Sequence, residues 1–239
     1  MDTKELLLAI ETRKPTYQGT SKTVYDLGDG TCFVRLVPSL TSYTYDRHEL
    51  VPGTERIRLD FYELAASRLK RAGVPCVFER RLDESSYLAR FCPTPPFEVI
   101  VKNYAVGSTL RKYPGLFPAE SKFAHPIVKF DFRTSPEDQP IAEDYVREYG
   151  LDVAKLKTLA LATNDVLQGW LQPRILLDFC IIAGLDERHD YCVTSEISPD
   201  CMRLRDANGS PLDKDLFRGG ATHAQITRIW SELVASLDR

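Results

Sequence analysis

The chain has 239 residues, of which 43% are hydrophobic and 27% are charged, and its net charge at pH 7 is −3. This composition excludes a disordered chain and a small disulfide-rich scaffold, and it argues against a nucleic-acid-binding module, which usually carries a broad basic surface. No apolar run is long enough to cross a bilayer, and the six cysteines form no CxxC pair. We therefore expect a cytoplasmic globular protein of one or two domains, with free thiols and with no membrane or nucleic-acid partner.

The first 104 residues predict mainly strands, together with two helices. Residues 1–14 set a short apolar run between charged residues, which predicts an amphipathic first helix. Residues 56–73 have apolar side chains at helical spacing and end on basic residues, a glycine and then a proline, which are helix stop signals. Short runs of β-branched and aromatic residues predict four strands, over residues 31–37, 75–81, 86–91 and 97–104.

The rest of the chain mixes helices and strands. Residues 105–140 are rich in proline and predict a loop-rich connection, whereas residues 141–171 predict a helical region that is interrupted near Gly150. Two more strands, expected to pair as a hairpin, and an amphipathic last helix are predicted over residues 174–184, 190–198 and 221–237. Because helices and strands are partly segregated, the pattern indicates an α+β fold of two lobes with a ligand cleft between them.

A glycine and a lysine near the start of the chain suit phosphate binding. Within the segment YQGTSKTVY, Gly19 and then Lys22 can place backbone N–H groups and one cation against phosphates. The segment is not a Walker A loop, because GxxxxGK[ST] is absent. Taken alone, it is better explained as a plain hairpin with a solvated Lys22.

The segment EVIVKNYAVGS combines charges with a glycine and a serine. Strand alternation places Glu98, Ile100 and Lys102 on one face, and Gly107 and Ser108 follow where the strand ends. The last two residues can offer a backbone amide and a hydroxyl to a phosphate. The alternative is a cross-strand salt bridge, which is common and contributes little.

Further acids and cations follow in the second half. Asp178 lies in the apolar run LLDFCIIAG, and a buried acid is unfavourable unless it meets a cation, hydrogen-bond donors or a metal. A structural Asp178 that caps a backbone turn is the rival interpretation. In SEISPDCMRL, Asp200 and Arg203 follow a proline turn, and an arginine offers a planar fork to phosphate or carboxylate. The charge cluster LDKDLFR is explained equally simply as a solvated loop.

In this order and spacing, these segments resemble the SAICAR synthetase family, the ATP-dependent ligases of purine biosynthesis. The likeness extends over about residues 16–235. Its motifs here are YQGTSKTVY, RAGVPCVFERR, EVIVKNYAVGS, ATNDVL, LLDFCIIAG, SEISPDCMRL and LDKDLFR. The resemblance implies a kinase-like or ATP-grasp-like nucleotide lobe over residues 1–104 and a second α/β lobe over residues 105–239, with ATP in the cleft between them.

The resemblance also implies an amide-forming ligase reaction and assigns roles by motif position. ATP phosphorylates the carboxylate of an azole ribonucleotide, and the amine of L-aspartate then displaces the phosphate. Lys22, Asp178 and Arg203 are the implied catalytic residues. The implied ATP contacts are Gly19, Lys22, Glu98 near adenine, and Asp178. The implied Mg²⁺ ligands are Glu49, Asp178 and Glu196. The ribonucleotide would be held by Lys102, Ser108, Asp200, Arg203, Lys214 and Arg218.

The chain departs from the family pattern at the end that holds the nucleotide and metal. Two positions that are acidic in the family are here Ile182 and Ser195, and a family lysine is Thr20. We therefore expect a ligase of shifted specificity in a specialised pathway, acting on a related azole ribonucleotide or amine. The alternatives are the ordinary purine-pathway SAICAR synthetase and a catalytically weak nucleotide-binding homologue. The expected partners are small-molecule substrates, and apolar faces on the terminal helices leave room for a homo-oligomer.

Overall fold

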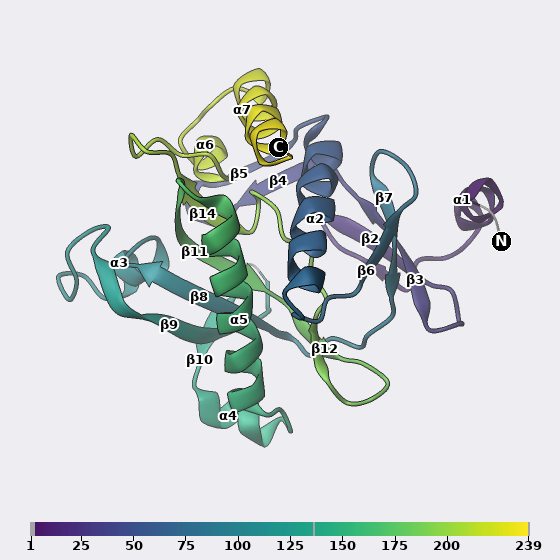
Figure 1. The fold of residues 1–239 in the computed structure, drawn as a ribbon, viewed down its shortest axis with the longest axis horizontal. Helices are drawn as coiled ribbons and strands as arrows, with labels where there is room; N and C mark the ends of the chain where they lie inside the picture. The colour runs from purple at the N-terminus through teal and green to yellow at the C-terminus, as the bar shows by residue number, and fades with distance from the viewer. Residues whose placement is uncertain (1–2, 136, 239) are drawn as a thin grey trace.

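The computed structural model describes residues 3–135 and 137–238. Two five-stranded antiparallel sheets lie side by side, and two long helices pack against each other where the sheets meet (Figure 1). Helix α2 (Thr54–Arg71) covers the first sheet, and helix α5 (Val153–Leu171) covers the second. The α+β class predicted from the sequence is confirmed by this arrangement.

The first sheet uses strands from the start of the chain. Its order is β1-β2-β3-β7-β6, with every neighbouring pair antiparallel. Three of its strands coincide with predicted ones, because their apolar and aromatic residues face α2. The strands are β1 (Tyr17–Gln18), β2 (Lys22–Asp26), β3 (Thr31–Leu36), β6 (Phe78–Arg81) and β7 (Ser86–Arg90). Helix α1 (Thr3–Glu11) packs against it through Leu6 and Ile10.

The second sheet carries the residues that matter for the site. Its order is β10-β9-β8-β11-β14, again antiparallel throughout, so β11 lies between β8 and β14. The strands are β8 (Phe97–Tyr104), β9 (Lys122–Phe132), β10 (Gln139–Ile141), β11 (Ile175–Ile181) and β14 (Met202–Arg205).

Two sequence predictions about this sheet need correction. The segment 105–140 is rich in loops, as predicted, but it also contains the eleven-residue β9, in which Phe130 is buried despite the nearby prolines. The predicted hairpin of residues 174–184 with 190–198 does not form as a whole, since β11 pairs with β8 and β14 instead. Only the ends of those segments, β12 (Ala183–Leu185) and β13 (Tyr191–Val193), pair with each other.

The remaining elements are short connections and a terminal helix. A second small hairpin joins β4 (Ser39–Ser42) to β5 (Arg47–Leu50) through a 3₁₀ turn at Tyr43–Tyr45. The other helices are α3 (Ser108–Lys112), α4 (Glu143–Glu148), α6 (Asp215–Arg218) and α7 (His223–Leu237). The predicted break near Gly150 separates α4 from α5. None of the described helices is both long and apolar enough to span a membrane.

One apolar core runs through both sheets and the helices between them. It includes Leu36 on β3, Phe61 on α2, Val101 on β8, Leu167 on α5 and Phe179 on β11, all of them buried. The strand before residue 104, β8, is hydrogen bonded into the second sheet. The chain therefore passes from the first sheet to the second before β8. The predicted division into two lobes at residues 104 and 105 remains a prediction.

Candidate active site

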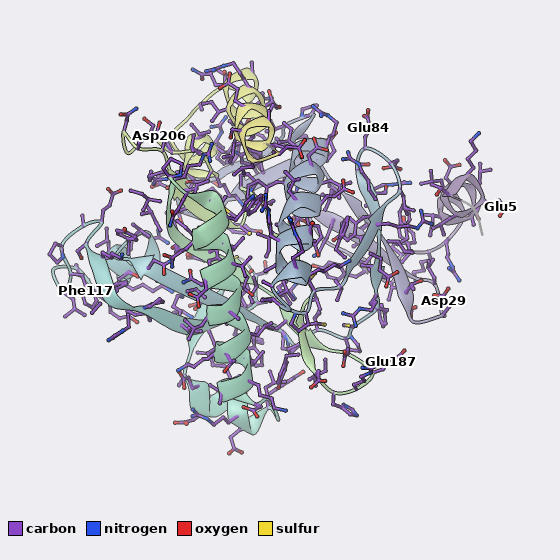
Figure 2. All side chains as sticks on the ribbon, viewed as in Figure 1. Glu5, Asp29, Glu84, Phe117, Glu187 and Asp206 are labelled. Carbon is purple, nitrogen blue, oxygen red and sulfur yellow. The ribbon has the colours of Figure 1, made fainter. Side chains whose placement is uncertain are left out.

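A cleft of about 1070 Å³ opens over the second sheet. It is lined by β8, β11 and β14, by the β9–β10 connection, by α3 and α6, and by the turn over residues 41–45. In Figure 2, Phe117 and Asp206 lie at the periphery, in turns that adjoin α3 and β14. Most of the predicted site residues line this cleft: Glu98, Lys102, Ser108, Asp178, Asp200, Arg203 and Arg218.

Three charged side chains meet at the centre of the sheet. The register places Asp178 on β11 directly opposite Lys102 on β8 and Arg203 on β14, so all three share one face. The Lys102 Nζ lies 2.9 Å from Oδ2 of Asp178, and Nη1 of Arg203 lies 2.8 Å from the same oxygen. Lys102 and Asp178 are only 3% and 4% exposed. One carboxylate thus holds two cations, which leaves one net positive charge.

The environment fixes the charge states of this cluster. Burial alone raises the pKa of Asp178, but Arg203 and Lys102 more than offset it, so the pKa of Asp178 lies below its usual range. Burial lowers the pKa of Lys102, and Asp178 acts in the opposite direction. The pKa of Lys102 is lowered overall, whereas Arg203 stays protonated and balances Asp178, so the cluster carries its extra positive charge, and suits an anionic ligand, when Lys102 is protonated.

Gly107 and Ser108 lie beside this cluster. Gly107 has a φ of +58°, and a Cβ built there would lie 2.5 Å from Nη2 of Arg203. A glycine is therefore needed for the guanidinium to lie against the backbone. Ser108 begins α3 and lines the same part of the cleft. The structure thus brings together Lys102, Ser108 and Arg203, the residues predicted to hold a phosphate, although their role stays a prediction.

A second layer of charges supports Arg203. Asp215 accepts from Arg205 at 2.5 Å and from Arg218 at 2.7 Å, and its Oδ2 lies 3.4 Å from Nε of Arg203. The turn before α6 also places Lys214 2.9 Å from Asp200. Burial raises the pKa of Asp200, but Lys214 and Arg58 more than offset this effect, so the pKa lies below its ordinary value and Asp200 is held ionised. Lys214 does not line the cleft and reaches it only through Asp200.

The predicted nucleotide residues Gly19 and Lys22 do not line the cleft. Lys22 opens β2, and burial lowers its pKa, while Glu196 raises it and Arg58 lowers it. Within the described part of the chain, Lys22 makes no side-chain hydrogen bond or salt bridge. Its free ammonium group is consistent with the predicted phosphate contact, which remains a prediction.

The three predicted Mg²⁺ ligands are not gathered into one site. Glu49 binds Arg47 at 2.6 Å and His223 at 2.5 Å, and these contacts lower its pKa to about 2. Glu196 accepts from Nε of Arg58 on α2 at 2.6 Å. Asp178 is held by its two cations. Across residues 3–135 and 137–238, no three His, Cys, Asp or Glu side chains are arranged to hold a metal, so these residues do not fit a protein-built magnesium site.

The two departures from the family pattern face each other in the structure. The Ile182 N–H donates to Oγ of Ser195 at 2.9 Å, and the Thr194 hydroxyl donates to the Ile182 carbonyl at 3.0 Å. Two expected carboxylates are thus replaced by a neutral hydrogen-bonded contact between β11 and the segment after β13.

Sequence reasoning missed a set of cleft residues on β9. Asp131 lies directly opposite Glu98 in the β8–β9 pair and binds Lys129 through both carboxylate oxygens, at 2.5 and 2.6 Å. Arg133 and Asp138 line the cleft beyond the end of that strand. The sequence pattern that could have revealed this strand is the charged residue at every second position, 129, 131 and 133, but the prolines nearby favoured a loop.

Comparison with known proteins relates the chain to one family. A sequence model of the SAICAR synthetase family matches residues 15–233. A phosphoribosylaminoimidazole-succinocarboxamide synthase of Methanocaldococcus jannaschii is 31% identical over 214 residues, which covers 86% of this chain and 88% of the relative.

Solved structures share the fold. A phosphoribosylaminoimidazole-succinocarboxamide synthase from Ehrlichia chaffeensis superposes with a TM-score of 0.86 at 22% identity and covers 94% of this chain and 98% of its own. A SAICAR synthetase in complex with ADP has a TM-score of 0.85 at 23% identity and covers 92% of this chain and 97% of its own. At these identities the structural likeness concerns the fold alone.

Proposed function

This chain belongs to the SAICAR synthetase family, and we propose that it is an ATP-dependent C–N ligase that joins L-aspartate to the carboxylate of carboxyaminoimidazole ribonucleotide. A carboxylate is a poor electrophile, so ATP first phosphorylates it to an acyl phosphate. The aspartate nitrogen then attacks the acyl carbon, and phosphate leaves. The products are the succinocarboxamide, ADP and phosphate.

The observation that carries this proposal is the cluster of Lys102, Asp178 and Arg203. It presents a net positive charge to the cleft, and Ser108 lies next to it. A preorganised cation pair of this kind suits the 5′-phosphate of a ribonucleotide, because charge-assisted hydrogen bonds to phosphate are among the strongest in proteins. The same cluster anchors the substrate at a fixed distance from the reacting carboxylate.

We propose that ATP lies between the two sheets, with its phosphates toward Lys22. A structural relative in complex with ADP supports a nucleotide site on this fold. Mg²⁺ would enter as part of the Mg-ATP substrate, since it is commonly held by substrate phosphates with few protein carboxylates. We further propose that the reaction takes place in the cytoplasm and involves only small-molecule partners.

The relatives favour the ordinary purine-pathway enzyme over the specificity-shifted ligase that the sequence suggested first. The names of these relatives specify the succinocarboxamide product. The shifted ligase is the second candidate, and the contact between Ile182 and Ser195 is the observation in its favour, because it removes two acids from the nucleotide end. A catalytically weak nucleotide-binding homologue is the third.

A turnover assay separates the three candidates. The protein is incubated with Mg-ATP, L-aspartate and carboxyaminoimidazole ribonucleotide, and the products are identified by mass spectrometry. The succinocarboxamide and ADP, formed at about one turnover per second or faster, support the proposed function. Condensation only with another amine or azole carboxylate supports the shifted ligase, and binding of Mg-ATP without any turnover supports the third candidate.

A further inference from the structure

Glu98 differs from the acids on the neighbouring strands and turn. Asp178, Asp131 and Asp200 each bind a lysine or an arginine, whereas Glu98 makes no salt bridge with any described residue. It lies on β8, four residues before Lys102, and both side chains are on the cleft-facing side of the strand. A carboxylate without a cation in a substrate cleft is available to react.

The surroundings of Glu98 come from strands β9 and β11 and from the connection between β9 and β10. Burial raises its pKa most, the carboxylates of Asp138 and of Asp131 on β9 raise it further, and Arg133 and the Cys180 thiol on β11 lower it, so that the pKa is about 7. Asp131 itself is paired with Lys129. At neutral pH, Glu98 can therefore both take up and release a proton, which is the property that a general base needs.

The position of Glu98 relative to the phosphate cluster also fits catalysis. Four residues along an extended strand separate the Cα atoms of Glu98 and Lys102 by about 13 Å. This separation is comparable with the span from the 5′-phosphate of a ribonucleotide to the far edge of its azole base. A ribonucleotide anchored at Lys102 and Arg203 and lying along β8 would therefore bring its reacting carboxylate near Glu98.

A cation for the incoming amino acid lies at the same end. Arg133 lines the cleft and makes no salt bridge within the described ranges. An amino acid carries one ammonium and at least one carboxylate, so Glu98 and Arg133 together match both kinds of charge.

We infer that Glu98 is the general base that takes a proton from the amine nucleophile. This inference rests on the proposed function. The carboxylate of Glu98 removes one proton from the ammonium group, the freed nitrogen forms the C–N bond, and the C–O bond to phosphate breaks. The nitrogen loses its second proton to the departing phosphate, which leaves as HPO₄²⁻, and Glu98 then returns its proton to solvent.

This role replaces the expected contact between Glu98 and adenine. The residues just before Glu98, 95–97, do not line the cleft, whereas Glu98 does, on the same strand face as the phosphate cluster. The carboxylate therefore belongs with the ribonucleotide and the amine.

The test compares two nucleophiles in the Glu98→Gln variant, which keeps the size of the side chain. The ammonium group of L-aspartate must lose a proton before it attacks, whereas hydroxylamine is already a free base at neutral pH and traps an acyl phosphate as a hydroxamate. We expect Glu98→Gln to lower kcat with aspartate by about 100-fold or more, the usual range for a general base. Hydroxamate formation should stay within a few-fold of the wild-type rate.

Two further variants control for indirect effects. Glu98→Asp keeps a carboxylate and should recover part of the aspartate rate. Glu84→Gln makes the same chemical change in the turn between β6 and β7, far from the cleft (Figure 2), and should change neither rate. Loss of both reactions in Glu98→Gln would overturn the inference, because the residue would then serve ATP binding or phosphorylation. An unchanged rate with aspartate would overturn it as well.

The pH profile gives an independent readout. For the wild type, kcat/KM for aspartate should fall as the pH drops below about 7, the pKa of Glu98, because the base becomes protonated. In Glu98→Gln, that limb should disappear, and persistence of the limb would contradict the inference. If the wild type forms no succinocarboxamide at all while it makes hydroxamate, the proposed function fails in its choice of amine, and this inference fails with it.

Discussion

The cleft-facing cluster on the second sheet and the junction between the two sheets handle buried charge in different ways. In the cluster, Asp178 binds two cations, Lys102 and Arg203, and one positive charge is left over. At the junction, Glu196 binds Arg58 and also accepts from the Ser198 hydroxyl at 3.4 Å, and the Glu196 and Arg58 side chains are almost completely buried. The cluster therefore has one cation more than its carboxylate balances, whereas the charges of Arg58 and Glu196 cancel.

The difference teaches which buried ion pairs point to a ligand. Arg58 donates further to the Val37 carbonyl at 2.9 Å, so its hydrogen bonds link α2 to the first sheet as well as to Glu196. A buried ion pair whose charges cancel, and whose other donors bind backbone carbonyls, links structural elements. Under this account, a cluster with an excess cation that lines a cleft binds a substrate.

The largest expected effect is that of Asp178→Asn. The substitution leaves two buried cations without their counter-ion, which costs about 3–5 kcal/mol of stability for a buried pair that loses one partner. Amide formation should become undetectable, because Lys102 and Arg203 then repel each other and lose their positions. Product analysis and thermal melting measure the two effects. A variant with near wild-type turnover would show that this cluster is not the substrate anchor.

Substitutions at the junction should change the stability of the fold and not the catalytic reaction. Arg58→Met leaves Glu196 buried and unpaired and should lower the free energy of unfolding by about 3–5 kcal/mol. The double variant Arg58→Met/Glu196→Met removes both charges and should recover most of that loss. Denaturant unfolding tests this contrast.

A second measurement at the junction addresses the predicted metal role of Glu196. Under this account, Glu196→Gln lowers the melting temperature and leaves the Mg²⁺ concentration for half-maximal activity unchanged. If the variant instead keeps its melting temperature and requires more Mg²⁺, Glu196 is a metal ligand after all.

Arg203→Ala should separate the two substrates. Loss of a hydrogen bond to a charged group costs about 1.5–3 kcal/mol, which corresponds to a 10- to 150-fold higher KM for the ribonucleotide. The KM for ATP should change little. Arg203→Lys restores the charge without the planar fork and should recover only part of the loss. Equal changes in both KM values would place Arg203 elsewhere in the reaction.

The smallest effect concerns pH and stability. The pKa of Glu98 is about 7 in the folded protein, against an ordinary value of 4.5. Between these values the folded state holds a proton that the unfolded state has lost, so stability falls as the pH rises through this window. Glu98→Gln removes the effect and should gain roughly 2 kcal/mol relative to wild type between pH 5 and pH 8. If the melting temperatures of the two proteins change with pH in the same way, the raised pKa of Glu98 is contradicted.

The sequence predicted the elements whose apolar pattern is strong. The helix over residues 56–73 appears as α2, since its apolar face and its stop signals agree. Lys102, Asp178 and Arg203 could be chosen by type and motif. Their meeting could not be predicted from local patterns, because it depends on the register of three strands that are far apart in the sequence.

Other features depend on contacts that the local sequence pattern did not show. The strand β9 was concealed by prolines, and with it the Asp131 that faces Glu98. Glu49 and Glu196 were assigned to a metal by motif position, but the structure gives each its own cation, Arg47 and Arg58. The Arg58–Glu196 pair joins segments that only the fold brings together, whereas Arg47 and Glu49 are two residues apart on β5 and so lie on the same face of one strand.

The most direct test of the central claim follows oxygen atoms. Carboxyaminoimidazole ribonucleotide labelled with ¹⁸O in its carboxylate is turned over with Mg-ATP and L-aspartate, and the phosphate product is analysed by mass spectrometry. An acyl phosphate intermediate transfers one carboxylate oxygen to phosphate, so we predict one ¹⁸O in phosphate for each amide formed. Amide formation with unlabelled phosphate, or ADP formation without any amide, would contradict the account of this cleft as an amide ligase.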